Sequence, residues 1–299
     1  MCRWFIAILL LLQLCSCKND AVLQHLKKVN YPANAIEWYQ NKFWLSGIKR
    51  SSLLVLDSAF NFLDSMQISS SNSEATSEFS LMSIVDSSLL LAGNGSVMPS
   101  RDSAVFINLV NRQIEGFRLD SFYERLRKMN IPNLDIRGIC PLPAGTILVN
   151  KGNPQFPHNY LFFTSKRFWK RQLHSDIHRI SVGFNLDSTH IRTITGLCYA
   201  PRKDQLILTI NRENLQENNS DSRSKSYLWI INSISAKTRW EAINPDRVVD
   251  LEKIDPRFKD ERIVSATVTR ETRGYLYLVL VAEEENGSCN LFRLVLPAV

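Results

Sequence analysis

A pattern of four short strands recurs along this chain, and it restricts the fold more than any other feature of the sequence. An apolar segment, a tight polar turn and a second apolar segment form a unit that occurs five times, with first segments at 35–39, 81–85, 138–141, 196–199 and 266–269. A third strand follows each unit, and a weaker fourth follows most of them, at 62–68, 113–119, 168–173 and 239–243. Runs of β-branched, aromatic and leucine residues bounded by Asn, Asp, Ser, Gly and Pro are typical of strands.

Repeats of four short strands predict an all-β chain folded as a β-propeller with five blades. The last repeat has three strands, and the segment 22–29, which precedes the first repeat, can supply its fourth strand. Ring closure by this N-terminal strand would leave no sheet edge unpaired. Two alternatives stay open. A sixth blade could lie inside the long segments 174–192 and 244–262, and the strand count alone also permits a two-sheet sandwich.

The connections between the expected strands fall into two length classes. Turns from the first strand to the second, and from the third to the fourth, are short, as at 40–41 and 57–61. Connections from the second strand to the third, and from one blade to the next, are mostly long, at 93–103, 150–159, 211–226, 283–289, 69–80, 120–135, 174–193 and 244–262. In antiparallel blades both long classes leave on the same rim. The sequence therefore predicts one loop-rich face, where we expect the binding site, because function concentrates on loops that a rigid scaffold carries.

One of the long connections has a helical pattern. Phe122, Leu126 and Met129 recur at helical spacing, with basic residues between them. We expect a short amphipathic helix at 120–129 that covers the rim, with a partner-binding helix as the alternative.

Polar residues on the expected loop-rich face are the candidate ligand contacts. Asn, Gly and a cation follow several second strands, as in 94–96, 150–153 and 211–214, where they could bind an anion or a sugar. Asn and Gly are also ordinary turn residues, and this second interpretation stays open. The full candidate set for ligand binding is Glu37, Asn94, Arg101, Asn150, Lys151, Asn153, Asn211, Arg212, Glu213 and Glu283.

Acidic residues on the same face offer a second kind of site. Hard cations such as Ca²⁺ require several oxygen ligands, but the spacing of Glu283–Glu285 matches no calcium loop. The five histidines have no metal-binding spacing, and no G-x-S-x-G elbow is present. The sequence therefore predicts no metal and no cofactor and favours a protein without catalysis. The alternative is a Ca²⁺ site made of Glu37, Glu78, Glu213, Glu283 and Glu285.

The first eighteen residues have the pattern of an export signal. Arg3 precedes an apolar run at 4–14, which is shorter than the roughly 20 residues of a membrane-spanning helix. The tetrapeptide Leu14-Cys15-Ser16-Cys17 resembles the lipobox of bacterial lipoproteins, in which the cysteine carries the lipid. We expect a signal peptide at 1–16, lipidated Cys17 with a short tether at 17–21, and one propeller domain at 22–299. This places the protein in the bacterial cell envelope, outside the cytoplasm, with secretion without lipid as the alternative.

Charge and cysteine content narrow the partners further. The chain carries 36 Lys and Arg against 29 Asp and Glu, but no run of five or six like charges marks a nucleic-acid-binding arm. We expect a membrane partner through the lipid, a saccharide or envelope protein as ligand, and no nucleic acid. Cys140, Cys198 and Cys289 are odd in number and lack metal spacing, which favours buried thiols, with one disulfide as the alternative.

Several strings resemble an uncharacterised bacterial β-propeller family of unknown function. The strings 35–38, 43–47 and 54–57 are similar to its first blade, 89–96 and 101–105 to its second, and 133–138 and 150–153 to its third, and 194–197 and 226–228 continue the likeness. That family is distantly similar to phytase-like esterase propellers, whose metal sites use rim carboxylates. The resemblance implies a metal-dependent esterase or phosphatase as the alternative function. Arg137, Ser265 and Ala266 stand where acids would be expected, which is a departure from that pattern.

Overall fold

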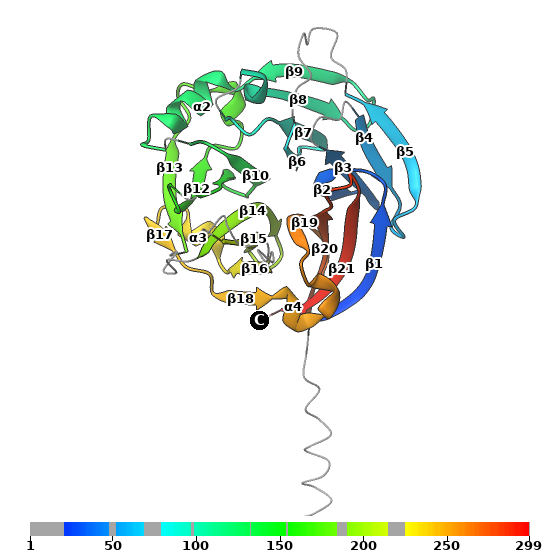
Figure 1. The fold of residues 1–299 in the computed structure, drawn as a ribbon. Helices are drawn as coiled ribbons and strands as arrows, with labels where there is room; N and C mark the ends of the chain where they lie inside the picture. The colour runs from blue at the N-terminus through cyan, green and yellow to red at the C-terminus, as the bar shows by residue number, and fades with distance from the viewer. Residues whose placement is uncertain are drawn as a thin grey trace, which may run out of the picture.

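The chain forms five β-sheets arranged as the blades of a propeller around one axis (Figure 1). The computed structural model describes residues 21–47, 52–68, 79–96, 99–131, 133–153, 155–183, 190–214 and 225–298. The expected signal peptide, Cys17 and Glu78 lie outside these residues, and so does the side chain of Glu213. The all-β propeller with five blades is confirmed, the two-sheet sandwich is wrong, and the described residues contain no sixth blade.

Each blade is a sheet of antiparallel strands. Blade 1 contains β2 (Ala33–Tyr39), β3 (Lys42–Gly47), β4 (Ser52–Leu56) and β5 (Phe62–Gln67). Blade 2 contains β6 (Leu81–Val85), β7 (Ser88–Ala92), β8 (Ser103–Asn108) and β9 (Ile114–Arg118). Blade 3 contains β10 (Ile136–Pro141), β11 (Thr146–Asn150), β12 (Asn159–Thr164) and β13 (Ile177–Val182). Blade 4 contains β14 (His190–Ala200), β15 (Gln205–Asn214), β16 (Lys225–Ile231) and β18 (Arg247–Asp250).

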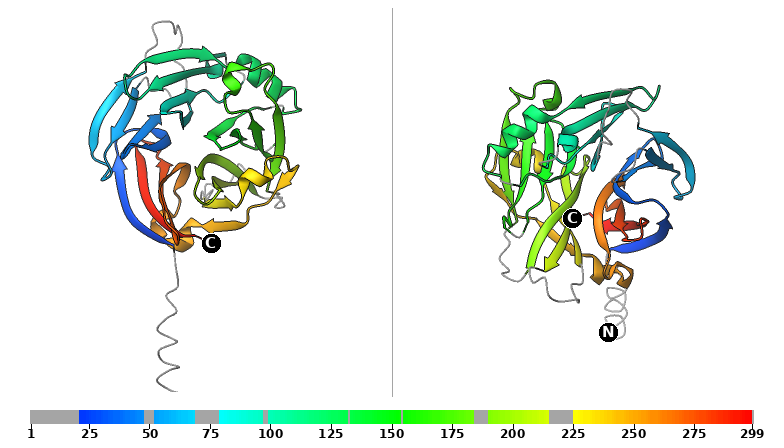
Figure 2. Two further views of the ribbon diagram at one scale, coloured as in Figure 1. Left: turned by 180° about the vertical axis from the view of Figure 1, so that it is seen from behind. Right: turned by 45° about the horizontal axis from the view of Figure 1, so that its top comes forward.

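Blade 5 closes the ring with a strand from the other end of the chain. It contains β19 (Arg262–Glu271), β20 (Tyr275–Glu283), β21 (Cys289–Pro297) and β1 (Val22–Val29). The strand β1 pairs antiparallel with β21 from Val22 opposite Val295 to Val29 opposite Cys289. Figure 2 shows the two strands, blue and red, side by side from behind. The predicted closure by the N-terminal strand is therefore confirmed.

The hydrophobic core is divided into five clusters, and each lies between two neighbouring blades. For example, Phe258 stacks on Phe292 with ring centroids 4.6 Å apart, in the cluster between blades 4 and 5. Trp229 of blade 4 packs with Leu161 and Val182 of blade 3. Because both faces of every blade are buried, the inner strands are apolar on both sides, which is why the sequence shows apolar runs rather than strict alternation.

Hydrogen bonds add a second link between neighbouring blades. Residues in the first half of three inner strands donate their backbone N–H to the preceding blade. Ile194 donates to Oδ1 of Asn159 at 3.1 Å, and Ile263 donates to Oγ of Ser226 at 3.2 Å. Ile136 donates to the carbonyl oxygen of Asn94 at 2.9 Å. A buried N–H without a partner is costly, so these two side-chain oxygens and one backbone carbonyl hold the three inner strands against the preceding blades.

The predicted helix is confirmed as α2 (Asp120–Arg127), with Phe122, Tyr123 and Leu126 buried beneath it. Its Arg125 donates to the carbonyl oxygens of Gln172 at 2.6 Å and Ser175 at 2.7 Å. The remaining short helices are α3 (Ile234–Lys237), α4 (Leu251–Ile254), and the 3₁₀ helices η1 (Pro99–Asp102), η2 (Phe168–Lys170) and η3 (Pro256–Phe258). No helix in the described ranges is long and apolar enough to span a membrane.

Two predicted fourth strands are wrong. Residues 168–173 contain η2 rather than a strand, because the ring of Phe168 is fully buried against Phe122, 4.3 Å away between centroids. Residues 239–243 contain only β17 (Ala242–Ile243), which pairs in parallel with β13 of blade 3. The connections 165–176 and 232–246 are therefore long, and they lie on the rim opposite the expected loop-rich face. Elaborated loops occur on both rims, so the one-sided prediction is wrong.

Candidate functional site

The five inner strands, β2, β6, β10, β14 and β19, lie beside one another around the axis. Four of them carry an irregularity in register near their start, between Ala33 and Ala35 in β2 and at the matching places in β10, β14 and β19. The residues two positions after the irregularity occupy equivalent places on these inner strands, and we call this ring of equivalent positions a level. The residues at this level are Glu37, Cys140, Cys198 and Thr267, and Ser83 takes the corresponding place in β6.

Glu37 is the one carboxyl among the five residues named at this level. The hydroxyl of Thr267 lies 3.5 Å from its Oε2, and Glu37 forms no ion pair with any described residue. Burial by the surrounding strands raises the pKa of Glu37 to about 8, although hydrogen bonds from Thr267 and the Trp38 N–H act in the opposite direction. The side chain keeps partial exposure to solvent. It is thus an enclosed carboxyl that water still reaches, and it is largely protonated at neutral pH.

Two thiols lie close to this carboxyl. Burial raises the pKa of both Cys140 and Cys198, and the charge of Glu37 raises it further. Cys289 also has a raised pKa, again because of burial. All three cysteines are free and buried, as the sequence favoured, and the alternative disulfide is absent among the described residues.

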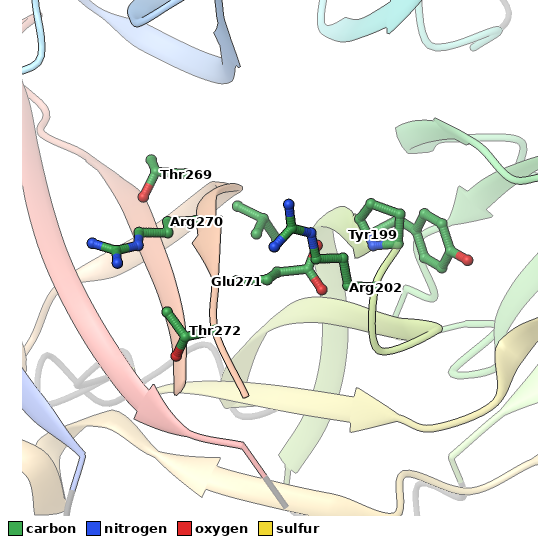
Figure 3. A pocket seen from close by; sticks show the side chains of 8 residues that line it. Tyr199, Arg202, Thr269, Arg270, Glu271 and Thr272 are labelled. Atoms are coloured by element: carbon green, nitrogen blue, oxygen red, sulfur yellow. The ribbon is translucent and has the colours of Figure 1, made fainter. Parts of the chain in front are cut away.

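A pocket of about 590 Å³ opens beside this level, on the rim of the tight turns (Figure 3). It lies between the first turn of blade 4 and the first turn of blade 5, and it is lined by Tyr199, Pro201, Arg202, Val268, Thr269, Arg270, Glu271 and Thr272. Tyr199 follows Cys198 in β14, and Val268 follows Thr267 in β19. The pocket therefore borders the level of Glu37. None of the residues that line this pocket was predicted from the sequence as a ligand contact.

The structure places several predicted ligand contacts between blades rather than in a pocket. Nδ2 of Asn94 donates to Oδ1 of Asp135 at 2.7 Å, and the Asp135 N–H donates to Oδ1 of Asn150 at 2.8 Å. The Lys151 N–H donates to the carbonyl oxygen of Asp135 at 2.9 Å. Asn94 and Asn150 are both buried. These three predicted residues thus meet at Asp135, where they join blades 2 and 3.

The other predicted contacts are spread over the ring. Asn211 is buried at the boundary of blades 4 and 5, where its Oδ1 accepts from Oγ of Ser226 at 2.7 Å. Asn153 stabilises its own turn by accepting from the N–H groups of Gln155 and Phe156. Arg101 donates to Oγ of Ser96 at 2.8 Å. Arg212 lies on β15 opposite Arg192, and Glu283 ends β20.

The acidic residues of the alternative metal site are described in part, because Glu78 and the side chain of Glu213 lie outside the described residues. Within the described ranges, no group of three or more His, Cys, Asp or Glu residues could hold a metal ion. In the loop after β20, Glu284 pairs with Lys28, and this contact lowers the pKa of Glu284 to about 2. Oε1 of Glu284 also accepts from Nδ2 of Asn290 at 2.9 Å. Glu284 therefore connects the closing strand β1 to the loop after β20 within blade 5.

Comparisons with known proteins place the chain in a family. A family model described as "Family of unknown function (DUF6910)" matches residues 73–287. The chain belongs to this family. The expectation of an uncharacterised propeller family is thereby confirmed, whereas the likeness to phytase-like propellers stays a prediction. No curated protein matches this DUF6910 member.

Solved structures resemble the DUF6910 chain in fold. The crystal structure of Myxococcus xanthus glutaminyl cyclase matches with a TM-score of 0.52 at 11% identity, over 94% of this chain and 98% of that one. A member of the DUF4221 family from Bacteroides vulgatus matches with a TM-score of 0.38 at 9% identity, over 86% of this chain and 76% of that one. The tail fiber of Staphylococcus aureus phage P68 matches with a TM-score of 0.47 at 8% identity, over 93% and 52%. At 11% identity, the likeness to the glutaminyl cyclase shows a shared fold alone.

Proposed function

We propose that this protein is a ligand-binding propeller of the bacterial cell envelope, held to a membrane by lipid on Cys17. Its ligand enters from the tight-turn rim and reaches Glu37. The observation that carries the proposal is the enclosed carboxyl of Glu37, whose pKa is raised to about 8 without a neighbouring cation. Such a group costs stability, and strongly perturbed carboxyls concentrate at functional sites. The pocket on the tight-turn rim, whose lining includes the residues next to Cys198 and Thr267, offers space for a ligand of moderate size.

The protonation state of Glu37 determines what it can recognise. A protonated carboxyl both donates and accepts hydrogen bonds, whereas a carboxylate only accepts. At neutral pH Glu37 therefore suits an uncharged polar group, such as the hydroxyl of a saccharide or the amide of a peptide. A saccharide or an envelope protein remains the expected class of partner, and Ca²⁺ is not needed for binding.

A thermal-shift panel tests this proposal. The full chain is heated with saccharides, amino acids, short peptides and Ca²⁺, because a ligand that binds only the folded state raises the melting temperature. We expect stabilisation by at least one organic compound and none by Ca²⁺. Glu37→Leu should abolish the stabilisation, and Glu115→Gln, an exposed carboxyl on β9, should leave it intact. Absence of any hit, or equal binding by Glu37→Leu, would refute the proposal.

Acid–base catalysis at Glu37 is a second candidate function. A catalytic carboxyl works best when its pKa lies near the working pH, as that of Glu37 does. The protein shares its fold with a glutaminyl cyclase. Peptides with N-terminal glutamine are therefore the first substrates to assay, and ammonia is the product to measure, because ring closure by the α-amine displaces the side-chain amide nitrogen. The metal-dependent esterase alternative gains no support from the described acidic residues.

A further inference from the structure

Two residues of opposite charge in the tight-turn pocket, Arg202 and Glu271, form no ion pair among the described residues. Oε2 of Glu271 is buried and accepts no hydrogen bond. Arg202 is exposed and makes no ion pair within the described chain. The two residues come from different blades, Arg202 from the turn after β14 and Glu271 from the end of β19. In Figure 3 both lie in the middle of the pocket, between these strands.

The other polar groups that line the pocket already have partners. The Tyr199 hydroxyl donates to Oδ1 of Asp204 at 3.0 Å. Oγ1 of Thr269 donates to the carbonyl oxygen of Tyr277 at 3.1 Å, and Oγ1 of Thr272 donates to that of Tyr275 at 3.2 Å.

The second arginine of the pocket is also engaged. The Arg270 guanidinium lies over the ring of Tyr277, 5.3 Å from the ring centroid. In Figure 3 this guanidinium points to the far side of β19, away from Arg202. Arg202 and Glu271 are therefore the two charged groups that the pocket leaves for a ligand.

We infer that this pocket binds a zwitterion, either a free α-amino acid or a short peptide. The ligand's ammonium group donates to the unpaired oxygen of Glu271, and its carboxylate accepts from the guanidinium of Arg202. This inference rests on the proposed function, because the pocket borders the level of Glu37 and would hold the charged end of the same ligand. It narrows the ligand class from any polar compound to one that carries both charges.

Three physical arguments support a zwitterion over an ion of one sign. A buried carboxylate oxygen without a donor is unfavourable, and an ammonium group removes that cost. The planar guanidinium matches a carboxylate and can bind both of its oxygens. A cation alone would leave Arg202 unpaired and an anion alone would leave Glu271 unpaired. The pocket volume of about 590 Å³ also lies in the range of small-molecule sites.

Titration calorimetry with matched compounds tests the inference. The probes are the standard L-amino acids and their homodipeptides, and for each compound that binds, the amine without its carboxylate and the acid without its amine. Binding is measured with the full chain, with Glu271→Gln and Arg202→Met, and with the controls Glu115→Gln and Arg239→Met, which alter exposed residues outside the pocket lining. We expect at least one zwitterion to bind. Either matched analogue and either pocket variant should weaken binding at least tenfold, and the controls should not.

Several outcomes would overturn the inference. Equal binding of the amine would show a simple cation site at Glu271, and equal binding of the acid would show an anion site at Arg202. Unchanged affinity in both pocket variants would place the ligand elsewhere. If no zwitterion binds, but a saccharide binds to the native chain and not to Glu37→Leu, the inference fails while the proposed function stands. If no probe binds at all, both fail.

Discussion

The backbone N–H of Trp38 donates a hydrogen bond to Oγ1 of Thr267 at 3.1 Å, although 229 positions separate the two residues. One level away, the N–H of Ile36 donates to Oγ of Ser265 at 3.3 Å. These bonds join the inner strand of blade 1 to that of blade 5, at the place where the ring closes. Thr267 also contacts Glu37. The hydroxyl of Thr267 thus contacts both the backbone that joins blades 1 and 5 and the carboxyl of Glu37, whose protonation it affects.

Replacing Thr267 by valine should therefore destabilise the closed ring. Valine has nearly the shape of threonine but leaves the Trp38 N–H without its acceptor. The loss of a partner for a partly buried donor costs about 1–3 kcal/mol in the free energy of unfolding. Urea denaturation followed by tryptophan fluorescence measures the change. Thr267→Ser keeps the hydroxyl and should retain most of the stability; a loss equal to that of the valine variant would show that packing, not the hydrogen bond, is responsible.

Stability should fall as the pH rises through the range set by Glu37. The ordinary pKa of a glutamate is 4.5, and burial raises that of Glu37 to about 8 in the folded state. The folded protein therefore binds the proton more tightly than the unfolded chain, and the free energy of unfolding decreases with pH between these two values. The loss is complete about one pH unit above the folded-state pKa, near pH 9, and it amounts to roughly 2–4 kcal/mol after allowance for partial exposure.

Glu37→Gln is the variant that isolates this effect. Glutamine cannot titrate, so the difference in unfolding free energy between the variant and the native chain should grow in favour of the variant from about pH 5 to about pH 9. Urea denaturation over this range measures the difference, and other titrating groups cancel in it. Glu115→Gln on the exposed face of β9 should give a constant difference. A constant difference for Glu37→Gln as well would mean that the carboxyl is hydrated like an ordinary surface glutamate.

The sequence predicted the ring because each blade repeats one local pattern. The closure by segment 22–29 could be predicted because the last repeat lacks a strand, and unpaired edges are unfavourable. The fourth strands of blades 3 and 4 were placed wrongly, because the apolar residues at 168–173 serve a different contact. Phe168 fills a site under α2 beside Phe122, and this tertiary contact has no signature in local spacing.

The candidate site was predictable only in part. Glu37 was predicted as a residue of the loop-rich face, but it lies within the inner strand β2, and its burial depends on strands 100 or more positions away. Asn94 and Asn150 were predicted because asparagines follow or end equivalent second strands. The structure gives this regularity a physical reason, since both side chains form hydrogen bonds with Asp135 at the boundary of blades 2 and 3. Arg202 and Glu271 could not be paired from sequence. They belong to two unrelated turns, and only the ring brings these turns together.

Glycine at position 196 should be required for the packing of blades 4 and 5. A Cβ atom added to Gly196 would lie 2.7 Å from the carbonyl oxygen of Val264 and 3.2 Å from Cα of Ser265. Both atoms belong to the backbone of β19, so they cannot turn aside. We expect Gly196→Ala to lower the unfolding free energy by about 1–3 kcal/mol in chemical denaturation, the usual cost of overpacking.

Gly274 provides a matched control in the same pair of blades. A Cβ atom there would meet nothing within 4 Å. Gly274→Ala should change stability by less than about 1 kcal/mol, with a slight gain expected because alanine restricts the unfolded chain. Equal effects of the two substitutions would show that the close approach of β14 and β19 does not limit stability.

Cys17 should decide whether the protein is held to a membrane. Two or more acyl chains on one cysteine anchor a protein stably, because each buried CH₂ contributes about 0.8 kcal/mol. In a bacterial host the native chain should incorporate radiolabelled palmitate and partition into the detergent phase. Cys17→Ser should lose both properties, while Cys15→Ser, two positions earlier in the same tetrapeptide, should keep them. If the label persists in Cys17→Ser or disappears in Cys15→Ser, Cys17 is not the lipid acceptor, and the proposed tether loses its basis.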